Sequence, residues 1–144
     1  MTLEEIIAEW KQLSVIDHTK FTYEITRTPM LHARFLEHYI FFKAKLASEE
    51  RKMSKIKNLK RKYYRGEMDK TELDAQGWIQ FQGLKPSSGE LNQLFDLDPD
   101  LSAIEERLAY WKTGVTAIEY ILKQIQSREW GLKAILDYEK FVAG

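Results

Sequence analysis

The chain contains no cysteine, and its 144 residues include only three prolines and seven glycines. Without thiols it has no disulfide, no thiolate metal site and no cysteine nucleophile. It also lacks a P-loop or GxGxxG sequence, which excludes the glycine-rich loops that hold nucleotide phosphates. No run approaches 18 apolar residues, and the N-terminus has early acids where a signal peptide has bases. We therefore expect a soluble, intracellular protein without a membrane partner and without ATP hydrolysis of its own.

Catalytic and metal-binding groups are scarce as well. Of the three histidines, His32 and His38 are six residues apart, which places them on different faces of a helix, and His18 stands alone. Adjacent acids point about 100° apart on a helix and cannot share a proton. These pairs are Glu4–Glu5, Glu49–Glu50 and Glu105–Glu106. We predict no catalytic residue, no metal ligand and no cofactor, and do not expect an enzyme.

What is present favours helices. The chain is 44% hydrophobic and 31% charged with few helix breakers, a composition typical of a mainly helical folded protein. Thr2 and Glu5 form a capping-box pattern ahead of a helix expected over residues 3–13. We predict an all-α fold with a single domain spanning residues 1–144.

The first 65 residues are expected to hold the N-terminal helices. Asp17 or Thr19 can cap a second helix, and Pro29 either kinks that helix or begins a new one with Thr28 as its cap. Neither glycine nor proline occurs again before Gly66, so one helix of roughly 35 residues, about 50 Å long, is expected. Residues 66–98 are rich in glycine, proline and serine and are expected to form an irregular connection, in which a short strand or a helical turn is the alternative left open.

Residues 99–144 are predicted to be C-terminal oligomerisation helices. Asp98 caps them with Pro99 in the first turn, and Ser127 can cap a final helix or mark a bend. Eight apolar residues recur there in steps of three and four, namely Leu101, Ile104, Leu108, Trp111, Val115, Ile118, Leu122 and Ile125. This stripe is either the inner face of a monomeric bundle or, as its regularity favours, a self-association surface. Gly114 beside it is expected to permit close packing of a neighbouring helix.

The long helix shows a weaker coiled-coil-like seam. A heptad assignment gives ten seam positions, seven of them apolar or aromatic. These are His32, Phe35, Tyr39, Phe42, Leu46, Glu49, Met53, Ile56, Lys60 and Tyr63.

Charge is strongly segregated in a chain whose 22 basic and 22 acidic residues balance. Residues 43–65 contain ten Lys or Arg against two acids, whereas residues 67–107 contain ten acids against three bases. The basic block is either a solvated face that meets acidic protein segments or a surface that binds nucleic acid through phosphates and stacked bases. Tyr64, which lies off the seam, is the better stacking candidate, and Trp78 and Phe81 are expected to be buried. The predicted DNA contacts are Lys55, Lys57, Lys60, Arg61, Lys62, Tyr64 and Arg65.

Several segments together resemble the UvsY family of recombination mediators of T4-like phages. They are VIDHTKFTYE at residues 15–24, the pair Met30-Leu31, the basic helix ending in Tyr63-Tyr64 and Gly66, the pair Tyr110-Trp111, and the tail from SREWGLKAI to FVAG. The family's Leu-Lys-x-Arg-like run before Tyr-Tyr is altered here, with Lys60 in the Arg position and Asn58 in the Lys position. Residues 67–100 match poorly.

The resemblance implies a ring-shaped homo-oligomer, heptameric in the family, that binds single-stranded DNA. It also implies two protein partners, a RecA-like phage recombinase and the single-strand-binding protein that the recombinase replaces. The expected location is the cytoplasm of the infected bacterial host cell. The alternative is a structural coiled-coil scaffold or oligomeric adaptor whose basic helix contacts only protein.

Overall fold

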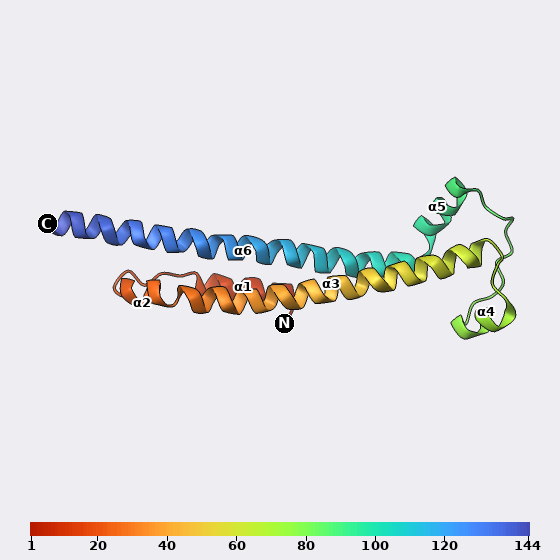
Figure 1. The fold of residues 1–144 in the computed structure, drawn as a ribbon, viewed down its shortest axis with the longest axis horizontal. Coiled ribbons are helices and arrows are strands. Elements are labelled where there is room, and N and C mark those ends of the chain that lie inside the picture. Colours follow the sequence, from red (N-terminus) through yellow and green to blue (C-terminus); the bar gives the residue numbers. More distant parts are fainter. The chain divides into compact units, whose positions relative to one another are not determined.

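The computed structural model describes residues 1–144 and contains helices but no strands (Figure 1). The helices are α1 (Leu3–Leu13), α2 (Phe21–Thr26), α3 (Thr28–Tyr64), α4 (Lys70–Gln76), α5 (Ser88–Leu97) and α6 (Pro99–Ala143). The all-α prediction is confirmed. None of these helices combines the length and apolar character that a membrane span requires.

The helix signal at the start of α1 operates as the sequence indicates, whereas the prediction that Asp17 or Thr19 caps the second helix is wrong. The N-cap residue of α2 is Lys20, which makes no side-chain capping hydrogen bond. The Thr2 side chain accepts from the Glu5 N–H, and the Glu5 carboxylate accepts from the Thr2 N–H, completing the capping box of α1. A new helix begins at Thr28, separated from α2 by Arg27 alone. Pro29 lies in the first turn of α3, where its missing N–H leaves no helical hydrogen bond unmade.

The structure differs from the sequence-based predictions in residues 66–98 and at Ser127. Residues 66–98 include two short helices, α4 and α5, so the prediction of an irregular connection is wrong for most of this segment. Asp69 and Ser87 cap them by accepting from the N–H groups of Glu72 and Glu90. In the C-terminal part, α6 continues through Ser127 without interruption, so no second helix begins there.

The chain divides into two compact units. Unit 1 comprises residues 1–44 and 111–144, and unit 2 comprises residues 45–110. Helices α3 and α6 each contribute residues to both units. The assignment of residues 1–144 to a single domain stays a prediction.

Unit 1 packs α1, α2 and the first part of α3 against the C-terminal part of α6. Its most deeply buried side chains are Ile6, Phe35, Phe42, Ile118, Ile125 and Leu132. Gly114 allows a close approach between helices, since a Cβ atom there would lie 2.2 Å from the Phe42 ring. The expectation that Gly114 serves packing is confirmed.

Unit 2 packs the basic half of α3 against α5 and the start of α6. Leu91, Phe95 and Leu101 form its buried core, and Met53 and Ile56 of α3 pack against them. Figure 1 shows α4 and α5 near the C-terminal end of α3. This unit therefore holds most of the basic block together with most of the acidic segment.

Candidate nucleic-acid interface

The basic residues of α3 in unit 2 lie mainly on the face opposite the core. Residues 51, 55, 58, 62 and 65 follow one another in steps of four and three, which keeps them on one side of a helix. They are Arg51, Lys55, Asn58, Lys62 and Arg65, all exposed. Met53 and Ile56 point to the opposite side and pack on the core. We call the first set, together with exposed Arg61, the basic stripe.

Arg61 and Lys57 extend the basic stripe at its edges. Arg61 donates from Nη1 to the Asn58 side-chain oxygen over 2.9 Å, which fixes its guanidinium beside the gap that Asn58 leaves in the stripe. Lys57 is exposed at the edge, with its ammonium 6.0 Å from the centre of the Phe95 ring. Arg51, Lys55, Lys57 and Arg65 make no ion pair, so their charges are available to anions.

Lys60 belongs to the core instead of the stripe. Only 5% of the residue is exposed, and its ammonium lies 3.1 Å from Asp98 and 2.8 Å from Asp100. It also lies 4.2 Å from the centre of the Trp78 ring. Burial disfavours the charged ammonium, but hydrogen bonds to Asp100 and Asp98 outweigh it and raise the Lys60 pKa. The prediction that Lys60 contacts DNA is therefore not supported by its position, because a phosphate would have to displace two carboxylates.

Tyr64 is also committed to the protein interior. Its hydroxyl donates to Asp98 over 2.6 Å, and burial together with this hydrogen bond raises the Tyr64 pKa. Its ring makes an edge contact with Phe81 at 5.0 Å between centroids. Because the Tyr64 hydroxyl is hydrogen-bonded and its ring packs against Phe81, stacking on a base would require the ring to leave this cluster.

The remaining aromatics of the region join the same cluster. Tyr63 donates its hydroxyl to the Ile79 carbonyl over 2.6 Å and packs against Trp78 and Phe81 at 5.3 Å and 5.9 Å between centroids. Trp78 and Phe81, which the sequence predicts to be buried, are partly buried. The cluster fixes the 78–81 segment to the end of α3.

Asp98 joins α3 to the start of α6. Its Oδ1 accepts from the N–H groups of Asp100 and Leu101, which caps α6, while its Oδ2 accepts from Tyr64 and Lys60. Burial favours the neutral acid, but these hydrogen bonds outweigh it and hold the Asp98 pKa below its ordinary value. One buried carboxylate thus orients the C-terminal end of the basic helix.

Lys62 is the one member of the basic stripe with an ion pair. Its ammonium lies 2.8 Å from the Glu72 carboxylate of α4, and this hydrogen bond raises the Lys62 pKa. The pair is exposed, so Lys62 remains accessible from solvent.

Arg51 is a functional candidate that belongs to the basic block of residues 43–65 but is not among the predicted DNA contacts. The step of four residues from Arg51 to Lys55 is the signal that identifies it, because it continues the stripe by one turn. The structure shows Arg51 exposed and without an ion pair.

The C-terminal stripe predicted for oligomerisation is buried within the single chain. Leu101, Ile104, Val115, Ile118 and Ile125 are buried, and Leu108, Trp111 and Leu122 are partly buried. The structure therefore favours the interpretation of an inner face over that of a self-association surface. The physical reason is that α3 of the same chain supplies the covering side chains, as where Phe42 meets Trp111 at 4.9 Å between centroids.

A second buried polar network lies in unit 1. Glu24 accepts from Arg27 Nε over 2.9 Å and also pairs with Arg128 of α6. Both arginines donate to backbone carbonyls at the end of α1, including that of Leu13. Burial favours the neutral acid, but the arginine and backbone donors outweigh it and lower the Glu24 pKa. Two segments that carry the family resemblance, residues 15–24 and the SRE sequence, meet in this network.

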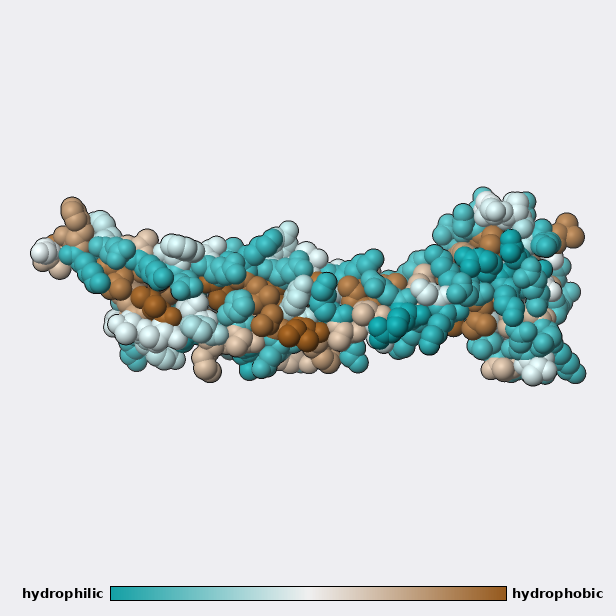
Figure 2. All heavy atoms as spheres, viewed as in Figure 1, coloured by the Kyte–Doolittle hydropathy of each residue, from teal (hydrophilic) through white to brown (hydrophobic).

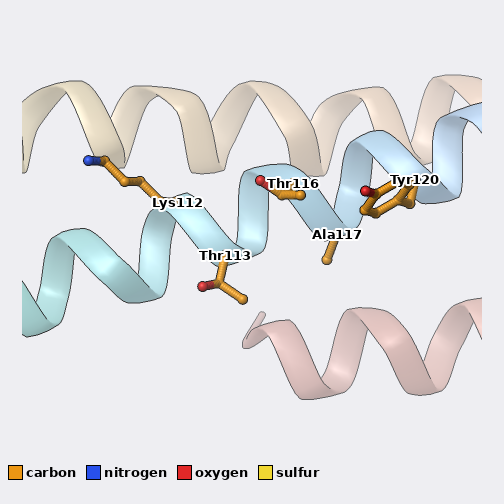
Figure 3. A pocket seen from close by; sticks show the side chains of 5 residues that line it. All are labelled: Lys112, Thr113, Thr116, Ala117 and Tyr120. Carbon is orange, nitrogen blue, oxygen red and sulfur yellow. The ribbon is translucent and has the colours of Figure 1, made fainter.

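A surface hollow of about 400 Å³ lies on α6 in unit 1, and Figure 3 shows the side chains that line it. Its labelled side chains are Lys112, Thr113, Thr116, Ala117 and Tyr120, and all of them project from this one helix. A single cation and three hydroxyls do not form a catalytic or metal-binding set. No group of His, Cys, Asp and Glu in the protein could hold a metal ion.

Comparisons with known proteins identify a family and similar solved structures. A family model described as "Recombination, repair and ssDNA binding protein UvsY" matches residues 9–144. The structure is similar to a crystal structure of the bacteriophage T4 recombination mediator protein UvsY, lattice type II, with a TM-score of 0.88 and 26% identity. That match covers 100% of this chain and 99% of the other. The lattice type IV structure gives a TM-score of 0.81 and 23% identity, covering 98% of each chain. No curated protein sequence matches.

Proposed function

Because the chain belongs to the UvsY family, we propose that it is a recombination mediator that binds single-stranded DNA along the basic stripe. In this role it promotes loading of a RecA-like recombinase in place of the single-strand-binding protein. The observation that carries the proposal is the stripe itself, in which five cations share one exposed helix face while the opposite face packs on the core. Such a face presents charge to a phosphate backbone without disturbing the fold.

The mechanism needs no covalent chemistry. Arg51, Lys55, Lys62 and Arg65 contact successive phosphates, and Arg61 spans the gap at Asn58. Backbone contacts of this kind are independent of base sequence, as a mediator acting on any strand requires. The protein therefore acts by holding DNA, and we propose that it is not an enzyme and works in the cytoplasm of the infected host cell.

We further propose that the protein acts as a ring-shaped homo-oligomer, a heptamer as the family resemblance implies. Several copies of a weak site in one assembly multiply the overall affinity for a strand. Figure 2 shows apolar side chains on the visible face over the helices of unit 1. The exposed large hydrophobic and aromatic side chains of unit 1 include Ile40, Trp130, Tyr138 and Phe141, the last 83% exposed. Exposed apolar surface of this extent is typical of a protein interface.

A salt series tests the DNA site. Binding of a fluorescent oligonucleotide should weaken linearly in log affinity against log salt, with a slope of about 0.7 per phosphate contact. The double variant Lys55→Ala/Arg65→Ala should bind more weakly at low salt and have a shallower slope, smaller by about 1.4 for two lost contacts. The matched control is Lys112→Ala/Lys123→Ala, which removes two exposed lysines of α6 in unit 1. An equal loss of affinity in both variants would contradict the assignment of the basic stripe as the DNA-binding site.

The scaffold alternative is favoured by one observation, the use of Lys60 and Lys62 in contacts with carboxylates of the same chain. Absence of binding to single-stranded DNA at low salt, with the oligomer intact, would replace the mediator proposal by this alternative. Light scattering on the same samples gives the oligomer mass.

A further inference from the structure

Lys62 is the only cation of the basic stripe that an acid of the same chain already holds. Its ammonium lies 2.8 Å from Glu72, whereas Arg51, Lys55 and Arg65 have no ion pair and Arg61 bonds a neutral amide. Lys62 lies between Lys55 and Arg65 along the stripe, so a strand that follows the stripe must pass it. A phosphate there meets a site occupied by a carboxylate.

Glu72 is held in place by the fold of α4. Asp69 caps this helix by accepting from the Glu72 N–H over 2.8 Å, and the neighbouring Leu73 is buried. Gly77 ends the helix in the left-handed conformation at φ 71°, and the Trp78 N–H donates to the Leu73 carbonyl over 3.0 Å. The carboxylate is therefore presented to Lys62 by an anchored element and not by a free side chain on a loose loop.

The surroundings of Glu72 reinforce its effect. The negative charges of Glu67 and Asp69 also stabilise the charged Lys62 ammonium and contribute to its raised pKa. Carboxylates and phosphates seek the same ammonium, because both are anionic oxygen acceptors. The start of the acidic segment thus stands where the phosphate backbone would lie.

We infer that Glu72 is a built-in competitor for DNA: its carboxylate occupies Lys62 in the free protein and leaves when a phosphate binds. This inference rests on the proposed function and specifies how the same site is regulated. Since the pair is exposed to water, with side chains 46% and 35% exposed, displacement costs a few-fold in affinity and not orders of magnitude. A few-fold effect per copy is multiplied in an oligomer, and it keeps the strand releasable when a recombinase takes over.

The test is Glu72→Gln, which removes the charge and keeps the backbone N–H that Asp69 caps. It should bind single-stranded DNA about 2- to 5-fold more tightly than wild type at low salt, because an exposed pair is weak. The gain should shrink as salt rises, because screening weakens the competing pair. Asp74→Asn is the matched control: it removes one exposed acid of the same helix that makes no ion pair.

A double-mutant cycle separates competition at Lys62 from a general change in charge. In a Lys62→Met background, Glu72→Gln should raise affinity no more than Asp74→Asn does. An equal gain with and without Lys62, or a gain matching that of Asp74→Asn in the wild-type background, overturns the inference while leaving the DNA-binding proposal intact. Failure of the wild-type protein to bind single-stranded DNA at low salt overturns both.

Discussion

At the scale of single residues, Asp98 shows how one carboxylate organises unit 2. It caps α6 through two backbone N–H groups and accepts from Tyr64 and Lys60 of α3. A buried charge is tolerated only when partners replace the lost water, and both carboxylate oxygens of Asp98 have such partners. The end of the basic helix is therefore fixed by polar contacts as well as by apolar packing.

Asp98→Asn should destabilise the protein by about 3 kcal/mol, because it leaves the buried Lys60 ammonium with Asp100 as its only carboxylate. The measurement is urea unfolding followed by circular dichroism. Asp96→Asn, at an exposed position of α5, is the control and should change stability by less than about 0.5 kcal/mol. Equal effects of the two substitutions would show that the Asp98 contacts contribute nothing.

The same variant predicts a pH dependence. The Asp98 pKa is lowered on folding, so its contribution is present above about pH 4 and is lost as pH falls through the lower folded value. The Lys60 pKa is raised, so its contribution is present at neutral pH and is lost only in strong alkali. The stability difference between wild type and Asp98→Asn should therefore be constant near neutrality and shrink below pH 4. A difference that persists in acid would contradict this assignment.

At the scale of elements, α3 has two faces with different partners. Its seam residues are all buried or partly buried, including Lys60 and Glu49, while the basic stripe faces solvent. Glu49 is held by Arg107 of α6 over 3.1 Å and by Lys52 over 3.4 Å. The heptad phase, more than residue type, decides which charges are satisfied inside the protein.

Contact between α3 and α6 in unit 1 depends on a missing side chain at Gly114. Gly114→Ala should destabilise the protein by about 1–3 kcal/mol, because the added methyl group collides with the Phe42 ring and the gain in helix propensity is smaller. Gly131→Ala on the same helix meets no atom within 4 Å and should stabilise the protein by up to about 1 kcal/mol. Thermal unfolding distinguishes the two, and stabilisation by both would contradict the close approach.

At the scale of the whole molecule, the burial of the C-terminal stripe changes where association surfaces are expected. Ile118 is fully buried within one chain, so Ile118→Asp is expected to unfold the protomer and not merely to dissociate an oligomer. The apolar side chains left for other copies are the exposed ones, most of which belong to unit 1. They include two aromatic rings near the end of α6, Tyr138 and Phe141.

Tyr138→Ser/Phe141→Ser should therefore lower the oligomer mass in light scattering while leaving the helical content unchanged. The reason is that these rings contribute apolar area to an interface and little to the core of one chain. Leu84→Ser, at a position 93% exposed in unit 2, is the control and should leave the mass unchanged. An unchanged mass in the double variant would exclude these two rings from the interface.

The sequence by itself determined the helical class, the capped start of α1, the start of α6 at Pro99 and the length of α3, because these depend on local signals. Capping residues, proline positions and the spacing of apolar residues act within a few turns of chain. The heptad phase also placed Lys60 on the packed seam. This signal was outweighed by its position in a run of basic residues, which led to its inclusion among the predicted DNA contacts.

Only the tertiary structure decided which partners those helices meet. It showed that Lys60 and Tyr64 bind Asp98, 38 and 34 residues later, that α3 covers the C-terminal stripe, and that Glu72 holds Lys62. The physical reason is that burial and ion pairing depend on contacts between segments distant in sequence, which residue spacing within one helix does not encode.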